Sequence, residues 1–158
     1  MTYLFIVFNR WRSKRADRQL SKCVENEIAG DFLTLLLKVM SLAFRINPEY
    51  RRNITIDGFT GRYQFRSANN KVKVAAMFTG KGLKVKRRRL IKDPDVTVTF
   101  KDGKSIMNYL RSYLLGMGGD VLKLVLKNEV VIKGNVNYVY RFFYMANHVQ
   151  LALTGRLP

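Results

Sequence analysis

DVTVTFKDGKSIMNYLRSYLLGMGGDVLKLVLKNEVVIKGN, residues 95–135, decides the fold because its apolar pattern changes period three times. The alternation in VTVTF, at 96–100, predicts a strand with one buried face. Helical spacing follows over 102–115 and again over 120–127, and each helix begins on a capping aspartate. A second strand is predicted at 129–133. A strand, a helical crossover and a returning strand form the centre of an open sheet with helices on one face.

Composition points to one folded unit that is strongly basic. The chain has 158 residues, 47% of them hydrophobic, which is enough for one core. A single cysteine and a single histidine exclude disulfide scaffolds and zinc sites of the usual kind, so no metal or cofactor is expected. The net charge is +18, and residues 51–104 carry 15 basic against 4 acidic side chains. A field of this sign attracts nucleic-acid phosphates or anionic lipid head groups.

Two helices are predicted before the sheet. Residues 1–30 form a basic, helical N-terminal extension, in which a polar helix over 16–29 ends at Gly30. Asp31 then caps a second helix whose apolar positions extend nearly all round it, so we expect it to be buried on more than one side. The apolar run at 3–8 is too short to span a bilayer, and its basic residues come after the apolar block, which is opposite to the order in a secretory signal.

An antiparallel meander is predicted from Asn53 onward. Strands are expected around Ile54 and Ile56, then around Tyr63 and Phe65, followed by strands at 71–79 and 83–89. The last strand places Lys84, Lys86 and Arg88 on one face, where they are our candidates for contact with an anionic surface. A solvated sheet face explains the same charges without a partner.

The remaining segments offer no catalytic constellation. An apolar, aromatic helix is predicted over 135–153, and His148 within it has no acidic or serine partner at a readable spacing. No phosphate loop, dinucleotide fingerprint, nucleophile elbow or zinc-protease motif occurs. The glycines at 116, 118 and 119 separate two helices. We therefore expect a protein that is not an enzyme.

The order of these elements resembles the sterol carrier protein 2 (SCP2) family. VTVTF at 96–100 and VVIKGN at 130–135 carry the resemblance, with TGRYQF at 60–65 as weaker support. It implies an α+β fold with a five-stranded, mostly antiparallel sheet, helices packed on one face, and N-terminal helices in addition. It also implies an apolar tunnel between sheet and helices that takes sterols, fatty acyl chains or similar lipids. On this reading, residues 31–158 are the lipid-binding domain.

The resemblance suggests which side chains line the tunnel. Its implied lining comes from inward-facing apolar residues on the strand at 96–100 and on the three helices that follow: Phe100, Ile106, Leu110, Leu114, Val121, Leu124, Val139 and Phe143. The heavily basic sheet differs from the modest charge of typical members, which favours an anionic amphiphile or an anionic membrane surface. The expected partner is a hydrophobic or amphiphilic lipid, of sterol, acyl or isoprenoid type, that the protein binds or transfers.

Two other function classes stay open. A nucleic-acid-binding protein could use the basic sheet face with Tyr63 or Phe65 as stacking platforms. These aromatics, however, alternate with the neighbouring cations along the strand and so point to the opposite face. An interaction subunit, for instance a homodimer, could cover the surplus apolar surface with an identical chain. In each case we expect a cytoplasmic protein that either stays in solution or attaches peripherally to a membrane.

Overall fold

The computed structural model describes residues 2–114 and 121–153, with side chains for 21–112, 123–149 and 151. The predicted glycine linker at 116–119 and the capping role of Asp120 lie outside these residues. Five helices and five strands follow one another along the described chain in this order: α1 (Thr2–Ile46), α2 (Pro48–Thr55), β1 (Thr60–Ser67), β2 (Lys73–Thr79), β3 (Leu83–Arg87), β4 (Val96–Phe100), α3 (Gly103–Leu114), α4 (Val121–Leu126), β5 (Val130–Gly134) and α5 (Val136–Leu153).

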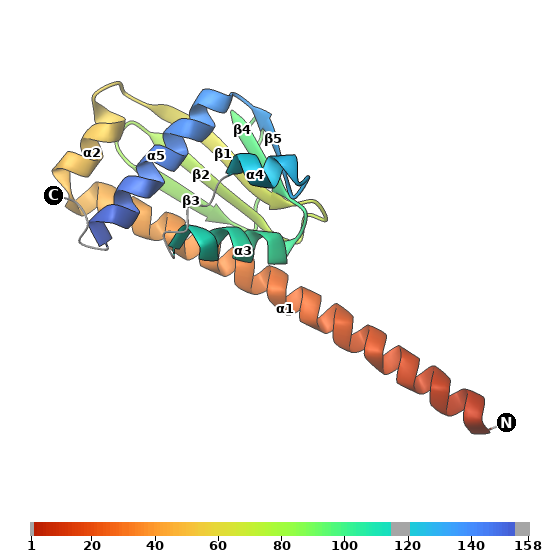
Figure 1. Ribbon diagram of the computed structural model, residues 1–158. Coiled ribbons are helices and arrows are strands. Elements are labelled where there is room, and N and C mark those ends of the chain that lie inside the picture. The colour runs from red at the N-terminus through yellow and green to blue at the C-terminus, as the bar shows by residue number, and fades with distance from the viewer. Residues whose placement is uncertain (1, 115–120, 154–158) are drawn as a thin grey trace.

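The five strands form one mixed sheet in the order β3-β2-β1-β4-β5. Three of the four pairings are antiparallel, and β1 pairs with β4 in parallel. Helices α3, α4 and α5 lie over one face of this sheet, while α1 runs past β3 and extends away from the body at its N-terminal end (Figure 1). The predicted fold class, a mostly antiparallel five-stranded sheet with helices on one face, is confirmed.

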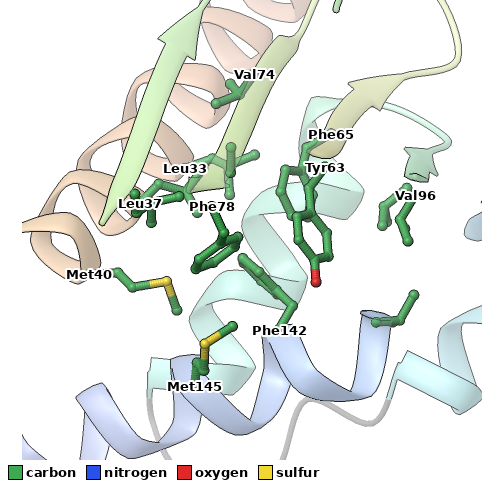
Figure 2. Packing of buried hydrophobic residues seen from close by; sticks show 14 of the residues in the cluster. Leu33, Leu37, Met40, Tyr63, Phe65, Val74, Phe78, Val96, Phe142 and Met145 are labelled. Atoms are coloured by element: carbon green, nitrogen blue, oxygen red, sulfur yellow. The ribbon is translucent and has the colours of Figure 1, made fainter. Parts of the chain in front are cut away.

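Alternation within the strands separates the two faces of the sheet. Every second residue of β4 is buried, and the same parity in β1 and β2 places Tyr63, Phe65 and Phe78 under the helices. These rings meet Phe142 of α5, and Figure 2 shows the cluster between the strands and the helices. The core therefore lies between the sheet and the helical layer, as the apolar parity predicts.

The connection from β3 to β4 crosses the opposite face of the sheet. It must pass β2 and β1, because β3 is an edge strand and β4 lies beyond β1. Gln64 points to this face and is nevertheless buried: its side-chain oxygen accepts the backbone N–H of Ile91 at 2.9 Å, and its nitrogen donates to the Val74 carbonyl at 3.1 Å. Ala75, the neighbour of Gln64 on β2, is also fully buried. The segment 88–95 therefore covers the middle of the outer sheet face.

Two predicted boundaries in the N-terminal part are wrong. Gly30 does not end a helix, since α1 continues through it without a break to Ile46. The buried face of α1 spans the glycine from Asn26 and Ala29 to Leu33, and this packing outweighs the roughly 1 kcal/mol that glycine costs within a helix.

The strand expected around Ile54 and Ile56 is the second error. Both residues belong to α2 or its C-terminal cap, because Asn47 and Pro48 start a new helix directly after α1. Ile54 is fully buried, whereas Ile56 is 75% exposed. The two isoleucines therefore do not share a strand face.

Gly134 fixes the pairing of β5 with β4. Its φ is +111°, and a Cβ on this residue would lie 2.1 Å from the carbonyl oxygen of Asp95. Because that oxygen belongs to backbone held in the sheet, the clash cannot be relieved by moving a side chain. The glycine of the VVIKGN segment is thus required by both conformation and space.

We expect Gly134→Ala to lower the free energy of unfolding by about 2 kcal/mol or more, because the strain and the clash add. Chemical denaturation monitored by circular dichroism measures the change. Gly82→Ala is the matched control, since a Cβ there meets nothing within 4 Å. Equal stabilities of the two variants would contradict the role assigned to Gly134.

Asp102 caps α3 as predicted. Its carboxylate accepts the backbone N–H and the hydroxyl of Ser105, both at 2.8 Å. Burial alone would raise its pKa, but the Ser105 hydrogen bonds, with the charges of Lys101 and Lys104, hold the pKa below the ordinary value. The folded state therefore gains stability from this carboxylate above the unfolded-state pKa and loses it as the pH falls through the folded-state pKa.

We expect Asp102→Ala to cost about 1 kcal/mol at neutral pH, because the cap is lost. Asp102→Asn keeps an acceptor for the N–H of Ser105 and should retain most of that stability while weakening its acid dependence. Urea denaturation of the three proteins between pH 3 and pH 7 makes the comparison. A wild type and an asparagine variant with identical acid dependence would contradict the proposed contribution of the charge.

Candidate functional site

An apolar cavity of about 100 Å³ lies between the sheet and the helices. Its walls come from α1, from the inner face of β1, β4 and β5, and from α3, α4 and α5. The lining residues are Leu33, Leu36, Leu37, Val39, Met40, Phe65, Val98, Phe100, Ile106, Tyr109, Leu110, Leu124, Val130, Phe142, Phe143, Ala146 and Val149. Within this lining, only Tyr109 carries an oxygen on its side chain.

The secondary structure accounts for this apolar lining. Val98 and Phe100 point inward because they share one parity of β4. Ile106 and Leu110 lie one helical turn apart on α3, and both are buried. Such a lining binds an apolar group by excluding water and by close contact, and the described part of it contains no carboxylate, imidazole or amine for acid–base chemistry.

The structure brings five of the eight predicted ligand-binding residues into the lining: Phe100, Ile106, Leu110, Leu124 and Phe143. Val139 is buried on α5 but does not line the cavity. The side chains of Leu114 and Val121 lie outside those that the structure describes. Leu124 and Phe143 are only partly buried, so the wall they form reaches the molecular surface.

Sequence reasoning missed the contribution of α1. Leu33, Leu37 and Met40 form the buried face of this helix, and with Leu36 and Val39 they line the cavity. The unusually wide apolar face over 31–46 was the available signal, because a helix that is apolar over more than its packed stripe has a second surface to contact.

Tyr63 holds the aromatic cluster beside the cavity. Its hydroxyl donates to the carbonyl of Tyr138 on α5 at 2.8 Å, and its side chain is 1% exposed. Burial, followed by the nearby Tyr138 phenol, raises the pKa of Tyr63 well above its ordinary value, so the group stays a neutral donor. Tyr63 and Phe65 lie under the helices and cannot act as nucleic-acid stacking platforms on the outer face.

The three cations that we predicted to contact an anionic surface do not lie together. Lys84 and Lys86 are exposed on the outer face of β3, the face opposite to the cavity. Arg88, with a φ of +58°, turns away and forms an ion pair with Glu27 of α1. Arg87 forms a similar pair with Asp31 of α1. These two arginines therefore attach β3 to α1.

No protein-family model and no curated protein matches the chain. Among solved structures, the ubiquinone synthesis protein UbiJ-SCP2 matches with a TM-score of 0.52 and 15% identity over 79% of this chain and 93% of that chain. The sterol carrier protein domain 2 of Helicoverpa armigera matches with a TM-score of 0.47 and 19% identity, covering 77% and 87% of the two chains.

The sec-alkylsulfatase Pisa1 from a Pseudomonas species also matches, with a TM-score of 0.48 and 15% identity over 60% of this chain. The chain spans 14% of the length of that enzyme. The likeness to UbiJ-SCP2 covers most of both chains and shows that this chain has an SCP2-like fold. The resemblance inferred from 96–100 and 130–135 is confirmed for the fold.

Proposed function

We propose that this SCP2-like domain binds the apolar chain of a lipid in the cavity between its sheet and helices, without catalysing a reaction, and that it does so at an anionic membrane surface. The observation that carries the proposal is the lining: seventeen side chains from the sheet and four helices converge on one space, and none of them is charged. A site of this kind excludes water and selects for length and shape.

The size of the cavity limits what enters without rearrangement. Ligand pockets generally measure about 300–1,000 Å³, whereas this cavity measures about 100 Å³. It therefore holds a short stretch of hydrocarbon, and a longer chain requires its wall to move outward. The least enclosed part of the wall is formed by the partly buried lining residues of α1, α4 and α5, which are Leu36, Val39, Leu124, Phe143 and Ala146.

The similar UbiJ-SCP2 is a ubiquinone synthesis protein, and ubiquinone carries an isoprenoid chain. Isoprenoid chains are therefore the first ligands to test, with fatty acids and sterols beside them. A linear isoprenoid or acyl chain fits a narrow apolar space more readily than a rigid sterol nucleus does, because it enters one segment at a time. We therefore rank linear chains before sterols.

The excess positive charge supports the membrane part of the proposal. The net charge of +18 attracts an anionic bilayer at long range, and Lys84 and Lys86 are exposed on the outer face of the edge strand β3. Among the described residues, no helix is long and apolar enough to cross a membrane. Contact through the charged surface would be peripheral and sensitive to salt.

Filling the cavity should abolish lipid binding. We expect Ala146→Phe, at a lining position of α5, to reduce the fraction of protein that carries copurified lipid by about tenfold, because the new ring takes up the space. Native mass spectrometry with extraction of bound lipid measures this fraction.

Asn147→Phe is the control, because it places the same ring at the adjacent exposed position of α5. Thermal denaturation verifies that both variants are folded. A wild-type protein that carries no lipid and takes up none of the offered isoprenoid, acyl or sterol probes would refute the proposed function. Lipid occupancy unchanged in a folded Ala146→Phe variant would refute the proposed site.

Charge reversal on the outer sheet face should weaken membrane binding. We expect the pair Lys84→Glu and Lys86→Glu to lower affinity for phosphatidylglycerol-containing vesicles about thirtyfold or more, since each cation near such a surface contributes about 1 kcal/mol. Vesicle cosedimentation at several salt concentrations measures the loss. Lys101→Glu with Lys104→Glu changes the net charge equally, so an equal loss there would show that total charge, and not this face, determines binding.

A further inference from the structure

Helix α1 exposes a row of apolar residues along one line, called here the stripe. Val24, Ile28, Leu35, Leu42 and Ile46 are between 48% and 71% exposed. At about 100° per residue, all five directions fall within an arc of about 40° on the helix. From Val24 to Ile46 the stripe extends over 22 residue steps, or about 33 Å. Single exposed apolar residues are ordinary on a surface, but five on one line are a candidate interface.

The stripe faces away from the domain. The buried residues of α1, which include Ala29, Leu33, Leu37 and Phe44, lie about 160° around the helix from it. Figure 1 shows α1 along the margin of the body, where one side of the helix contacts the fold. A partner helix can therefore lie along the stripe without displacing any of the helices and strands that the structure describes.

We propose that the stripe is covered by the α1 helix of a second copy of this chain, antiparallel to the first, with the twofold axis at Leu35. The spacing is symmetric about this residue: Ile28 and Leu42 are seven positions away on either side, and Val24 and Ile46 are eleven. A twofold axis at Leu35 places Ile28 against Leu42 and Val24 against Ile46, so every apolar residue of the stripe meets another.

The charges beside the stripe select the antiparallel direction. Glu27 and Asp31 precede Leu35, while Lys38 and Arg45 follow it, and all four lie on the same flank of the stripe. An antiparallel pair brings the acidic half of one helix to the basic half of the other, with Asp31 nearest Lys38. A parallel pair would place this charged flank of one helix against the opposite flank of the other, so these four residues would not meet.

The ion pairs that Glu27 and Asp31 already form within the chain do not prevent these charge contacts between two copies. Asp31 is bound to Arg87 and Glu27 to Arg88 within the chain, yet both carboxylates remain more than half exposed. A carboxylate has two oxygens and accepts from more than one cation. The intrachain pairs hold the acidic residues in place beside the stripe.

The oligomeric state tests the proposal without any lipid. Sedimentation equilibrium of the full chain should give twice the monomer mass of 18.4 kDa. We expect Leu35→Lys to shift the dissociation constant at least about a hundredfold toward monomer, because it places two like charges on the axis. Leu126→Lys, at an 82% exposed leucine of α4, should leave the dimer unchanged.

Disulfide cross-linking tests the direction. In a Cys23→Ser background, Leu35→Cys should cross-link two chains under mild oxidation, since the axis brings the two positions together. Ile28→Cys should not, because antiparallel pairing separates the two copies of residue 28 by about 21 Å. Ile28→Cys combined with Leu42→Cys should cross-link efficiently.

A monomeric wild type at all concentrations overturns the proposal, as does a dimer that survives Leu35→Lys. Efficient cross-linking of Ile28→Cys alone overturns the antiparallel direction. A monomer whose vesicle binding is lost in Leu35→Lys would assign the stripe to a bilayer and also overturn it. These results are independent of lipid occupancy, so failure of the proposed function would not imitate them.

Discussion

The distance between α5 and the sheet depends on Tyr63. Its ring stands on the inner face of β1 at the centre of the sheet, and its hydroxyl is fixed to the backbone of α5 at Tyr138. Phe65, Phe78 and Phe142 pack around it as rigid rings. Large rigid rings leave gaps that smaller side chains do not fill completely. The cavity borders this cluster, since Phe65 and Phe142 belong to its lining.

Helix α1 combines two roles that the sequence pattern presents as one. Its wide apolar surface is divided between a face that packs on the fold and lines the cavity and a face that remains in solvent. Leu33 and Leu35 illustrate the division, because they are two residues apart and lie on opposite sides of the helix. The same helix therefore connects the interior site with the outer surface.

Much of the fold could be predicted from periodicity. The strands around Tyr63, at 96–100 and at 129–133, the Asp102 cap and the long C-terminal helix all follow from local spacing, because local sterics and one-sided burial determine them. Gly30 could not be read correctly, since the packing that carries α1 through it comes from residues distant in sequence. Ile54 and Ile56 were misassigned because two residues of one parity cannot distinguish a strand from a short helix.

The candidate site likewise has a part that could be predicted from the sequence and a part that could not. Phe100, Ile106 and Leu110 could be placed from their parity and the family resemblance, but the wall formed by α1 depends on where that helix docks. Arg88 left the face of Lys84 and Lys86 because its backbone turns to the left-handed region at the end of β3. Strand parity ends where the strand ends, and no spacing rule extends past that residue.

The crossing of segment 88–95 over the outer face has a consequence for how the sheet assembles. Strands β1 to β3 are neighbours in both sequence and space, and β4 pairs with β5 across the α3–α4 connection. The parallel seam between β1 and β4 joins these two halves, and the Gln64 hydrogen bond to Ile91 forms only when the crossing segment is in place. Partners across the seam are 33 residues apart in sequence and those of β4 and β5 are 30 to 38 apart, so both pairings carry a larger loop-closure cost than the hairpins of β1 to β3. The side-chain amide of Gln64, in the middle of β1, thus joins the sheet to the segment 88–95 that crosses its outer face.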